Sequence, residues 1–162
     1  MKLKVAQFST NILFALVMGV FWGTWFALSR SIIAFRAQTF LDIGQTAIRN
    51  LAVPMSILMP LALMSALILL ALLPKRSAAF ALAVTGFMLM VCALVVTLAV
   101  EVPIDNRIKV WTVATLPASW EAMRDRWEFY HTLRTFMSIV ALVSMTASTL
   151  SNLKNTVSIQ TA

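Results

Sequence analysis

Four long apolar runs dominate this chain and constrain its fold more than any other feature. They cover residues 8–34, 51–73, 78–100 and 135–151, and short polar stretches separate them. A helix needs about 20 apolar residues to cross a bilayer core, whereas the strands of a membrane barrel would alternate apolar and polar residues. Because the runs are continuously apolar, the sequence predicts an all-α membrane protein that folds as an antiparallel four-helix transmembrane bundle.

The polar residues beside these runs set the expected ends of the helices. Pro117 suits a helix start, so an amphipathic extension is expected to precede the last apolar run in one continuous helix. Pro54 and Pro60 lie inside the second run and are expected to kink its helix. A single domain of residues 1–162 is therefore predicted, with helices near residues 8–35, 51–73, 77–101 and 118–151.

Composition excludes several classes of protein. Apolar residues make up 60% of the chain and charged residues only 12%, which excludes an ordinary soluble domain and a disordered chain. The net charge is +7, which in a soluble protein would indicate nucleic acid. Here the basic residues stand between apolar runs, so membrane lipid is the expected partner and nucleic acid is not. They divide almost equally between the two membrane faces, so the orientation stays open.

A row of small residues in the first run indicates a close helix contact. Gly19, Gly23 and Ala27 are spaced by four, which lets another helix approach closely. We expect that helix to belong to the same chain. The alternative is a homo-oligomer that packs through Gly19 and Gly23.

The polar segment 101–134 is the candidate functional region. It holds five of the six acidic residues, the only histidine and three of the five tryptophans. Helical spacing places a seam of side chains on one face of the last helix, and a charged residue inside a membrane usually faces the bundle. A site within the bundle is therefore favoured over an interfacial helix that meets headgroups. The seam consists of Trp120, Arg124, Trp127, His131 and Arg134.

Carboxylates complete the predicted site. Glu101, Asp105 and Asn106 end the third helix at the same membrane face as His131, and a buried charge needs a partner. We expect Glu101 or Asp105 to pair with an arginine of the seam. Glu128 stands three residues before His131, a spacing at which it could orient the imidazole.

No metal or organic cofactor is expected. Di-iron bundles use two Glu-x-x-His pairs, and this sequence offers only the pair that ends at His131. It also contains no glycine-rich phosphate loop and no paired-cysteine motif. A single metal ion held by His131 and nearby carboxylates, or a haem on His131, stays open as an alternative.

The residues of this segment resemble a known family. The matching residues are Val102 to Ile108, Trp111, Arg126 with Trp127, His131, and Arg134 with Thr135. This pattern is similar to that of the anthrone oxygenase-like family of small four-helix membrane proteins. The chain departs from it at Glu101, where the family pattern has asparagine, and at Asp105, which stands near the second asparagine.

The resemblance implies an oxidation. Similar proteins convert anthrones to anthraquinones with O2 and no known organic cofactor, and the ligand would be an apolar or aromatic small molecule in a bacterial inner (plasma) membrane. The catalytic roles would fall to His131 as general base, Glu128 beside it, Arg134 at the oxyanion and Asn106 at the carbonyl. The substrate would contact Trp111, Trp120, Arg124, Trp127, Glu101 and Asp105.

Two other functions remain open from the sequence. One is a non-catalytic accessory or lipid-binding module, in which the tryptophans and arginines of the segment form a docking surface. The other is a subunit that handles a quinone or a haem.

Overall fold

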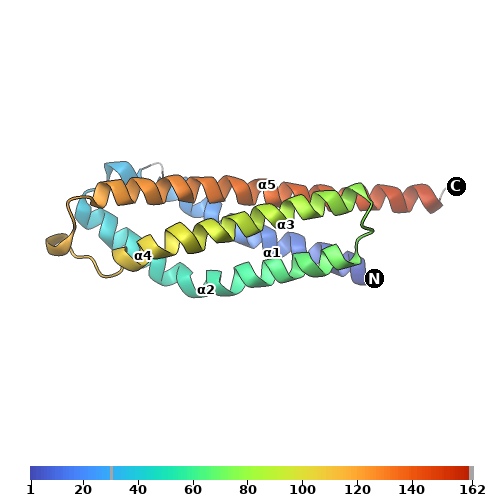
Figure 1. The fold of residues 1–162 in the computed structure, drawn as a ribbon, viewed down its shortest axis with the longest axis horizontal. Coiled ribbons are helices and arrows are strands. Elements are labelled where there is room, and N and C mark those ends of the chain that lie inside the picture. Colours follow the sequence, from blue (N-terminus) through green and yellow to red (C-terminus); the bar gives the residue numbers. More distant parts are fainter. Residues whose placement is uncertain (30, 161–162) are drawn as a thin grey trace.

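Four long helices run antiparallel in the computed structural model, which describes residues 1–29 and 31–160, except the side chains of 152–160 (Figure 1). Helix α1 continues into a π-helical turn, η1, and α3 continues through a second π-helical turn, η3, into α4. The short helices η2 and η4 lie in the two connections at one end of the bundle. The bounds are α1 Lys2–Thr24, η1 Trp25–Ser29, η2 Ile32–Ala34, α2 Ala37–Leu72, α3 Ala78–Val96, η3 Thr97–Glu101, α4 Val102–Ile108, η4 Val113–Thr115 and α5 Trp120–Gln160.

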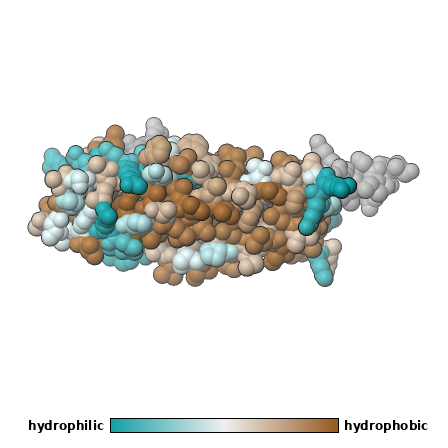
Figure 2. All heavy atoms as spheres, in the orientation of Figure 1, coloured by the Kyte–Doolittle hydropathy of each residue, from teal (hydrophilic) through white to brown (hydrophobic). Residues whose placement is uncertain are grey.

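The bundle has the surface of a membrane protein. On the face that Figure 2 shows, apolar residues predominate over the middle of the molecule and hydrophilic residues gather toward its ends. Four described segments are long and apolar enough to cross a membrane, and the described residues contain no strand. The predicted all-α transmembrane bundle is confirmed. The segments are Lys2–Ala34, Ala37–Leu72, Ala78–Ile108 and Trp120–Ser151.

Two helices extend beyond the apolar runs. Helix α2 begins at Ala37 rather than near Leu51, because Phe40, Leu41 and Ile48 bury one face of the added turns while the polar face stays exposed. The third span continues to Ile108 rather than ending at residue 101. Both extensions carry polar residues at this end of the bundle, among them Gln45 and Asp105.

Helix α2 stays helical through both of its prolines, Pro54 and Pro60. It bows outward from its neighbours along the lower edge of Figure 1. A proline removes one backbone hydrogen bond and is a common cause of a helix bend.

The closest helix contact is formed by α3 and α5. A Cβ atom at Gly86 would lie 2.8 Å from the carbonyl oxygen of Ala141 and 3.1 Å from the side chain of Met145. Ser148 donates a hydrogen bond of 2.6 Å to the carbonyl oxygen of Ala79. Small residues therefore bring these two backbones together, as expected where lipid provides no hydrophobic drive for association.

The predicted role of the small row in α1 is wrong for this chain's own helices. Apart from the adjoining residues and backbone of α1 itself, no atom of the described residues comes within 4 Å of the Cβ position of Gly19 or Gly23. Both glycines are exposed, because α1 meets its neighbours through larger side chains such as Phe14 and Phe21. A homo-oligomer through Gly19 and Gly23 stays a prediction.

We predict that Gly86→Ala destabilises the fold by about 1–3 kcal/mol, the usual cost of overpacking a tight contact. The matched control is Gly19→Ala, whose Cβ has open space and which replaces a poor helix former with a good one. Chemical denaturation in detergent measures both. Equal stability of the two variants would contradict the close α3–α5 contact.

Candidate functional site

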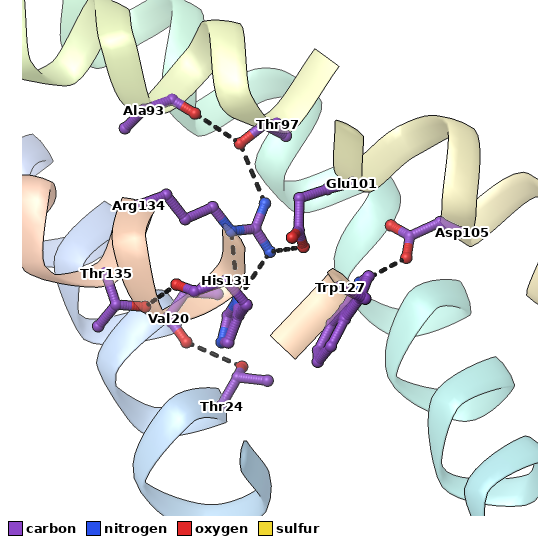
Figure 3. A network of polar contacts seen from close by, with 10 residues as sticks. All are labelled: Val20, Thr24, Ala93, Thr97, Glu101, Asp105, Trp127, His131, Arg134 and Thr135. Atoms are coloured by element: carbon purple, nitrogen blue, oxygen red, sulfur yellow. Dashed lines mark hydrogen bonds and ion pairs between the residues drawn. The ribbon is translucent and has the colours of Figure 1, made fainter. Parts of the chain in front are cut away.

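Arg134 on α5 is the centre of the polar cluster. Its Nη2 lies 2.8 Å from Oε2 of Glu101, whose side chain is fully buried. Its Nη1 donates a hydrogen bond of 3.0 Å to Oγ1 of Thr97. Figure 3 shows the guanidinium group between η3, which carries both partners, and His131 on its own helix. The predicted pairing of Arg134 with a carboxylate at the end of the third span is present.

The two partners of Arg134 on the third span stand four residues apart in the π-helical turn η3, a spacing that places side chains on one face of a helix. This turn spans Thr97–Glu101 and contains both Thr97 and Glu101. A π-helical turn adds one residue to a helical turn and occurs often at functional sites. Thr97 also donates a hydrogen bond of 2.8 Å to the carbonyl oxygen of Ala93, which fixes its hydroxyl group as an acceptor for Arg134.

His131 is bonded to Arg134 rather than to a carboxylate. Its Nδ1 lies 3.1 Å from Nε and 2.9 Å from Nη2 of Arg134. An arginine only donates hydrogen bonds, so Nδ1 accepts them and the proton of the neutral imidazole is on Nε2. Nε2 is buried and has no hydrogen-bond partner among the described residues. Because Nε2 carries a proton, this geometry does not favour haem ligation by His131.

Trp127 joins His131 to Asp105. Its ring stacks on the imidazole with a centroid distance of 4.9 Å and an interplanar angle of 12°. Its Nε1 donates a hydrogen bond of 3.0 Å to Oδ1 of Asp105 on α4 (Figure 3). The ring of Phe21 on α1 meets the imidazole edge-on from the opposite wall. The imidazole is thus held by aromatic contacts as well as by Arg134.

A cavity of about 480 Å³ lies beside this cluster. Its walls come from α1, from η2 and the bowed part of α2, from the third span and from α5, and most of the lining side chains are apolar. Asp105 is the only carboxylate among the described residues that line it. The polar lining residues are Thr24, Ser56, Thr97, Asp105, Lys109, Trp127, His131 and Arg134.

The structure brings together only part of the predicted site. The residues that meet are Glu101, Asp105, Trp127, His131 and Arg134. Asn106, expected at the substrate carbonyl, is exposed and accepts a hydrogen bond from Lys109. Glu128, expected beside the imidazole, instead accepts a hydrogen bond of 2.8 Å from Thr132. Neither side chain is among the cavity-lining residues in the described part of the chain.

Three other residues of the predicted site, Trp111, Trp120 and Arg124, are not among the described residues that line the cavity. Trp120 packs against Phe40, and the guanidinium group of Arg124 lies over the Trp120 ring. Arg124 also forms an ion pair of 2.9 Å with Asp125. The carbonyl oxygen of Trp111 accepts a hydrogen bond of 2.8 Å from Gln45.

The sequence did not indicate several residues that the structure places in the site. Thr97 was missed, although it stands four residues before Glu101 inside an apolar run, where a hydroxyl group is a visible signal. Phe21 and apolar residues of the middle of α2 also line the cavity. They lie within long apolar runs, so the sequence does not distinguish them from residues that face lipid. The described residues hold no group of three or more His, Cys, Asp or Glu side chains arranged for a metal ion.

The fold and this cluster define a class: a four-helix membrane protein with a buried arginine site beside an apolar cavity. A sequence model described as anthrone oxygenase matches residues 49–144, more than half of the chain, so the protein belongs to the anthrone oxygenase family. The match includes Glu101, Asp105, Trp127, His131 and Arg134. No curated protein and no solved structure matches the chain.

We predict that Glu101→Gln lowers the free energy of unfolding by about 3–5 kcal/mol, since it leaves a buried arginine without its counter-charge. The matched control is Asp125→Asn, which breaks an ion pair of similar length on a carboxylate that is 57% exposed. That change should cost at most about 1 kcal/mol. Denaturation in detergent compares the two, and equal losses would contradict the structural role of the buried pair.

Proposed function

We propose that this protein is a membrane enzyme that oxidises a flat, largely apolar aromatic ketone or phenol with O2 and without an organic cofactor. The observation that carries the proposal is the cavity of about 480 Å³, whose apolar walls meet polar groups at Asp105, Trp127, His131 and Arg134. Binding sites for small molecules are typically apolar cavities of roughly 300–1,000 Å³ with a few convergent polar groups. Membership of the anthrone oxygenase family supports the same reaction class.

The reaction converts an acidic methylene group, which lies across the central ring from an aromatic ketone and is conjugated with it through the aromatic rings, into a second carbonyl group. A base removes one methylene proton, and the electron pair moves into the ring system and onto the ketone oxygen. The carbon then bonds to O2, which is reduced to a hydroperoxide, and loss of water leaves the new carbonyl group. One O2 is consumed and one water is released for each methylene group oxidised.

Arg134 suits the charge that develops in this reaction. The anion formed by proton removal carries its charge largely on the ketone oxygen, and a prearranged cation in an apolar site stabilises such an oxyanion strongly. Arg134 lines the cavity and its side chain is held by Glu101, Thr97 and His131. The stacked Trp127 offers a flat surface beside it for the aromatic rings.

The exposed rim of the cavity supports entry from the lipid. Ala52, Ser56 and Pro60 line the cavity from α2 and are exposed on the outside of the bundle. Leu98 and Val102 line it from the facing span and are also exposed. These five residues lie within the apolar parts of their helices, so the opening faces the acyl chains of the bilayer. Such an opening suits a substrate that is dissolved in the membrane.

We predict that the purified protein consumes O2 with anthrone and forms anthraquinone, and that Arg134→Lys loses most of this activity because lysine lacks the planar fork of donors. The control is Arg126→Lys, which changes an exposed arginine whose guanidinium group lies over Tyr130. Oxygen electrode traces and product spectra provide the readout. A folded wild type that is inert with anthrone and retains co-purified lipid in the cavity would favour the lipid-binding module instead.

We predict that Leu98→Trp lowers kcat/KM for anthrone by roughly tenfold or more, since a larger side chain takes up space at the rim. The control is Val95→Trp, one turn earlier. Val95 is 57% exposed and Leu98 59% exposed, but of the two only Leu98 is a cavity-lining residue. Equal kinetics for both variants would contradict entry between α2 and the third span.

A further inference from the structure

We infer that Asp105 is the general base of the proposed oxidation and that His131 is a positioning residue, which holds Arg134 in place and does not take the proton itself. This inference rests on the proposed function. The sequence predicted that His131 would be the base. The contacts of Asp105 and His131 instead indicate that the two side chains have different roles.

Neither nitrogen of His131 offers a lone pair to a substrate. Nδ1 accepts from two nitrogen atoms of Arg134, at 3.1 and 2.9 Å. The neutral ring therefore carries its proton on Nε2, which is buried. In Figure 3 the imidazole lies between Arg134 and the turn of α1 that contains Val20 and Thr24. For His131 to act as a base, it would have to release the guanidinium group that the reaction needs.

The two carboxylates differ in what they can reach. Glu101 is fully buried in its ion pair with Arg134 and is not among the cavity-lining residues of the described chain. Asp105 lines the cavity, and its Oδ1 accepts the Trp127 hydrogen bond. Its other oxygen, Oδ2, accepts no hydrogen bond from the described residues. Asp105 is therefore the carboxylate with a lone pair available to a substrate.

A chain of contacts connects Asp105, the proposed base, to Arg134, the proposed site of the oxyanion. Trp127 bonds to Asp105 and stacks on His131, and His131 in turn bonds to Arg134. In the proposed step, Asp105 takes the methylene proton while the ketone oxygen gains charge beside Arg134. The carboxylic acid then returns its proton to the peroxide formed with O2, so that the carboxylate is restored before water leaves.

The role of His131 is that of an acceptor. The guanidinium group meets Glu101 and Thr97 on one side and the Nδ1 atom of His131 on the other. A side chain that still accepts a hydrogen bond should preserve this arrangement, whereas an apolar side chain should not. The substitution His131→Gln keeps a hydrogen-bond acceptor at this position, and His131→Leu removes it.

The base is tested by proton exchange without O2. Anthrone is incubated with the detergent-purified protein in D2O under anaerobic conditions, and the loss of its methylene proton signals above the protein-free rate is followed by NMR. Asp105→Asn should lower this rate by roughly 10²–10⁴-fold, the usual contribution of a positioned general base. The control Asp42→Asn changes an exposed carboxylate that bonds to Gln38 on α2, and should exchange as the wild type does.

The positioning role is tested at the only histidine of the chain. A ¹⁵N-histidine spectrum of the wild type should show a proton on Nε2 and none on Nδ1. His131→Gln should lose less than the roughly 10²-fold that is the smallest loss expected of a missing base. His131→Leu should lose more than His131→Gln, because only glutamine supplies an acceptor to Arg134.

The outcomes separate this inference from the proposed function. Wild-type exchange rates in Asp105→Asn would overturn the inference, as would a proton on Nδ1 together with abolished exchange in His131→Gln. A wild type that exchanges protons but consumes no O2 would contradict the oxidation and support the base. A wild type that does neither would contradict both.

Discussion

The structure depends on how a buried arginine is accommodated inside a membrane-spanning helix. A charge at this depth is costly unless it is paired and hydrogen-bonded. Arg134 has three polar partners: the carboxylate of Glu101, the hydroxyl group of Thr97 and the imidazole of His131. Its guanidinium carbon also lies 4.6 Å from the ring centre of Phe21. Side chains from α1, η3 and α5 thus contact one guanidinium group, and these contacts connect the three segments at the level of the site.

The path of α2 accounts for the cavity beside the cluster. Its later turns are buried in one core with α3 through Met59, Ala62, Ala66 and Leu69, and its first turns contact the polar end of the third span. At the polar end, Gly44 approaches Ile108 and Gln45 donates hydrogen bonds to the carbonyl oxygens of Ile108 and Trp111. At the other end a short turn joins α2 to α3. Helix α2 contains Pro54 and Pro60 and bows outward along its length, and the cavity is lined both by this helix and by Arg134.

Much of the fold and part of the site follow from the sequence. The apolar runs specify four helices, and the helical spacing of Trp127, His131 and Arg134 places them on one face. The sequence did not determine which partner each polar side chain of the site takes, or where two helices come closest. His131 bonds to Arg134, three residues later on the same helix, whereas Glu128 accepts a hydrogen bond from Thr132. Likewise the close approach of α3 and α5 falls at Gly86, a lone glycine without the repeat that drew attention to Gly19 and Gly23.

The most direct test of the account is an experimental structure of the protein with anthraquinone, the product of the proposed reaction, bound in lipid nanodiscs. The account predicts that the rings lie between α2 and the third span, with one carbonyl oxygen within hydrogen-bond distance of Arg134 and a ring face near Trp127. Anthraquinone bound elsewhere, or a cavity that a lipid chain occupies in the presence of excess anthraquinone, would contradict it.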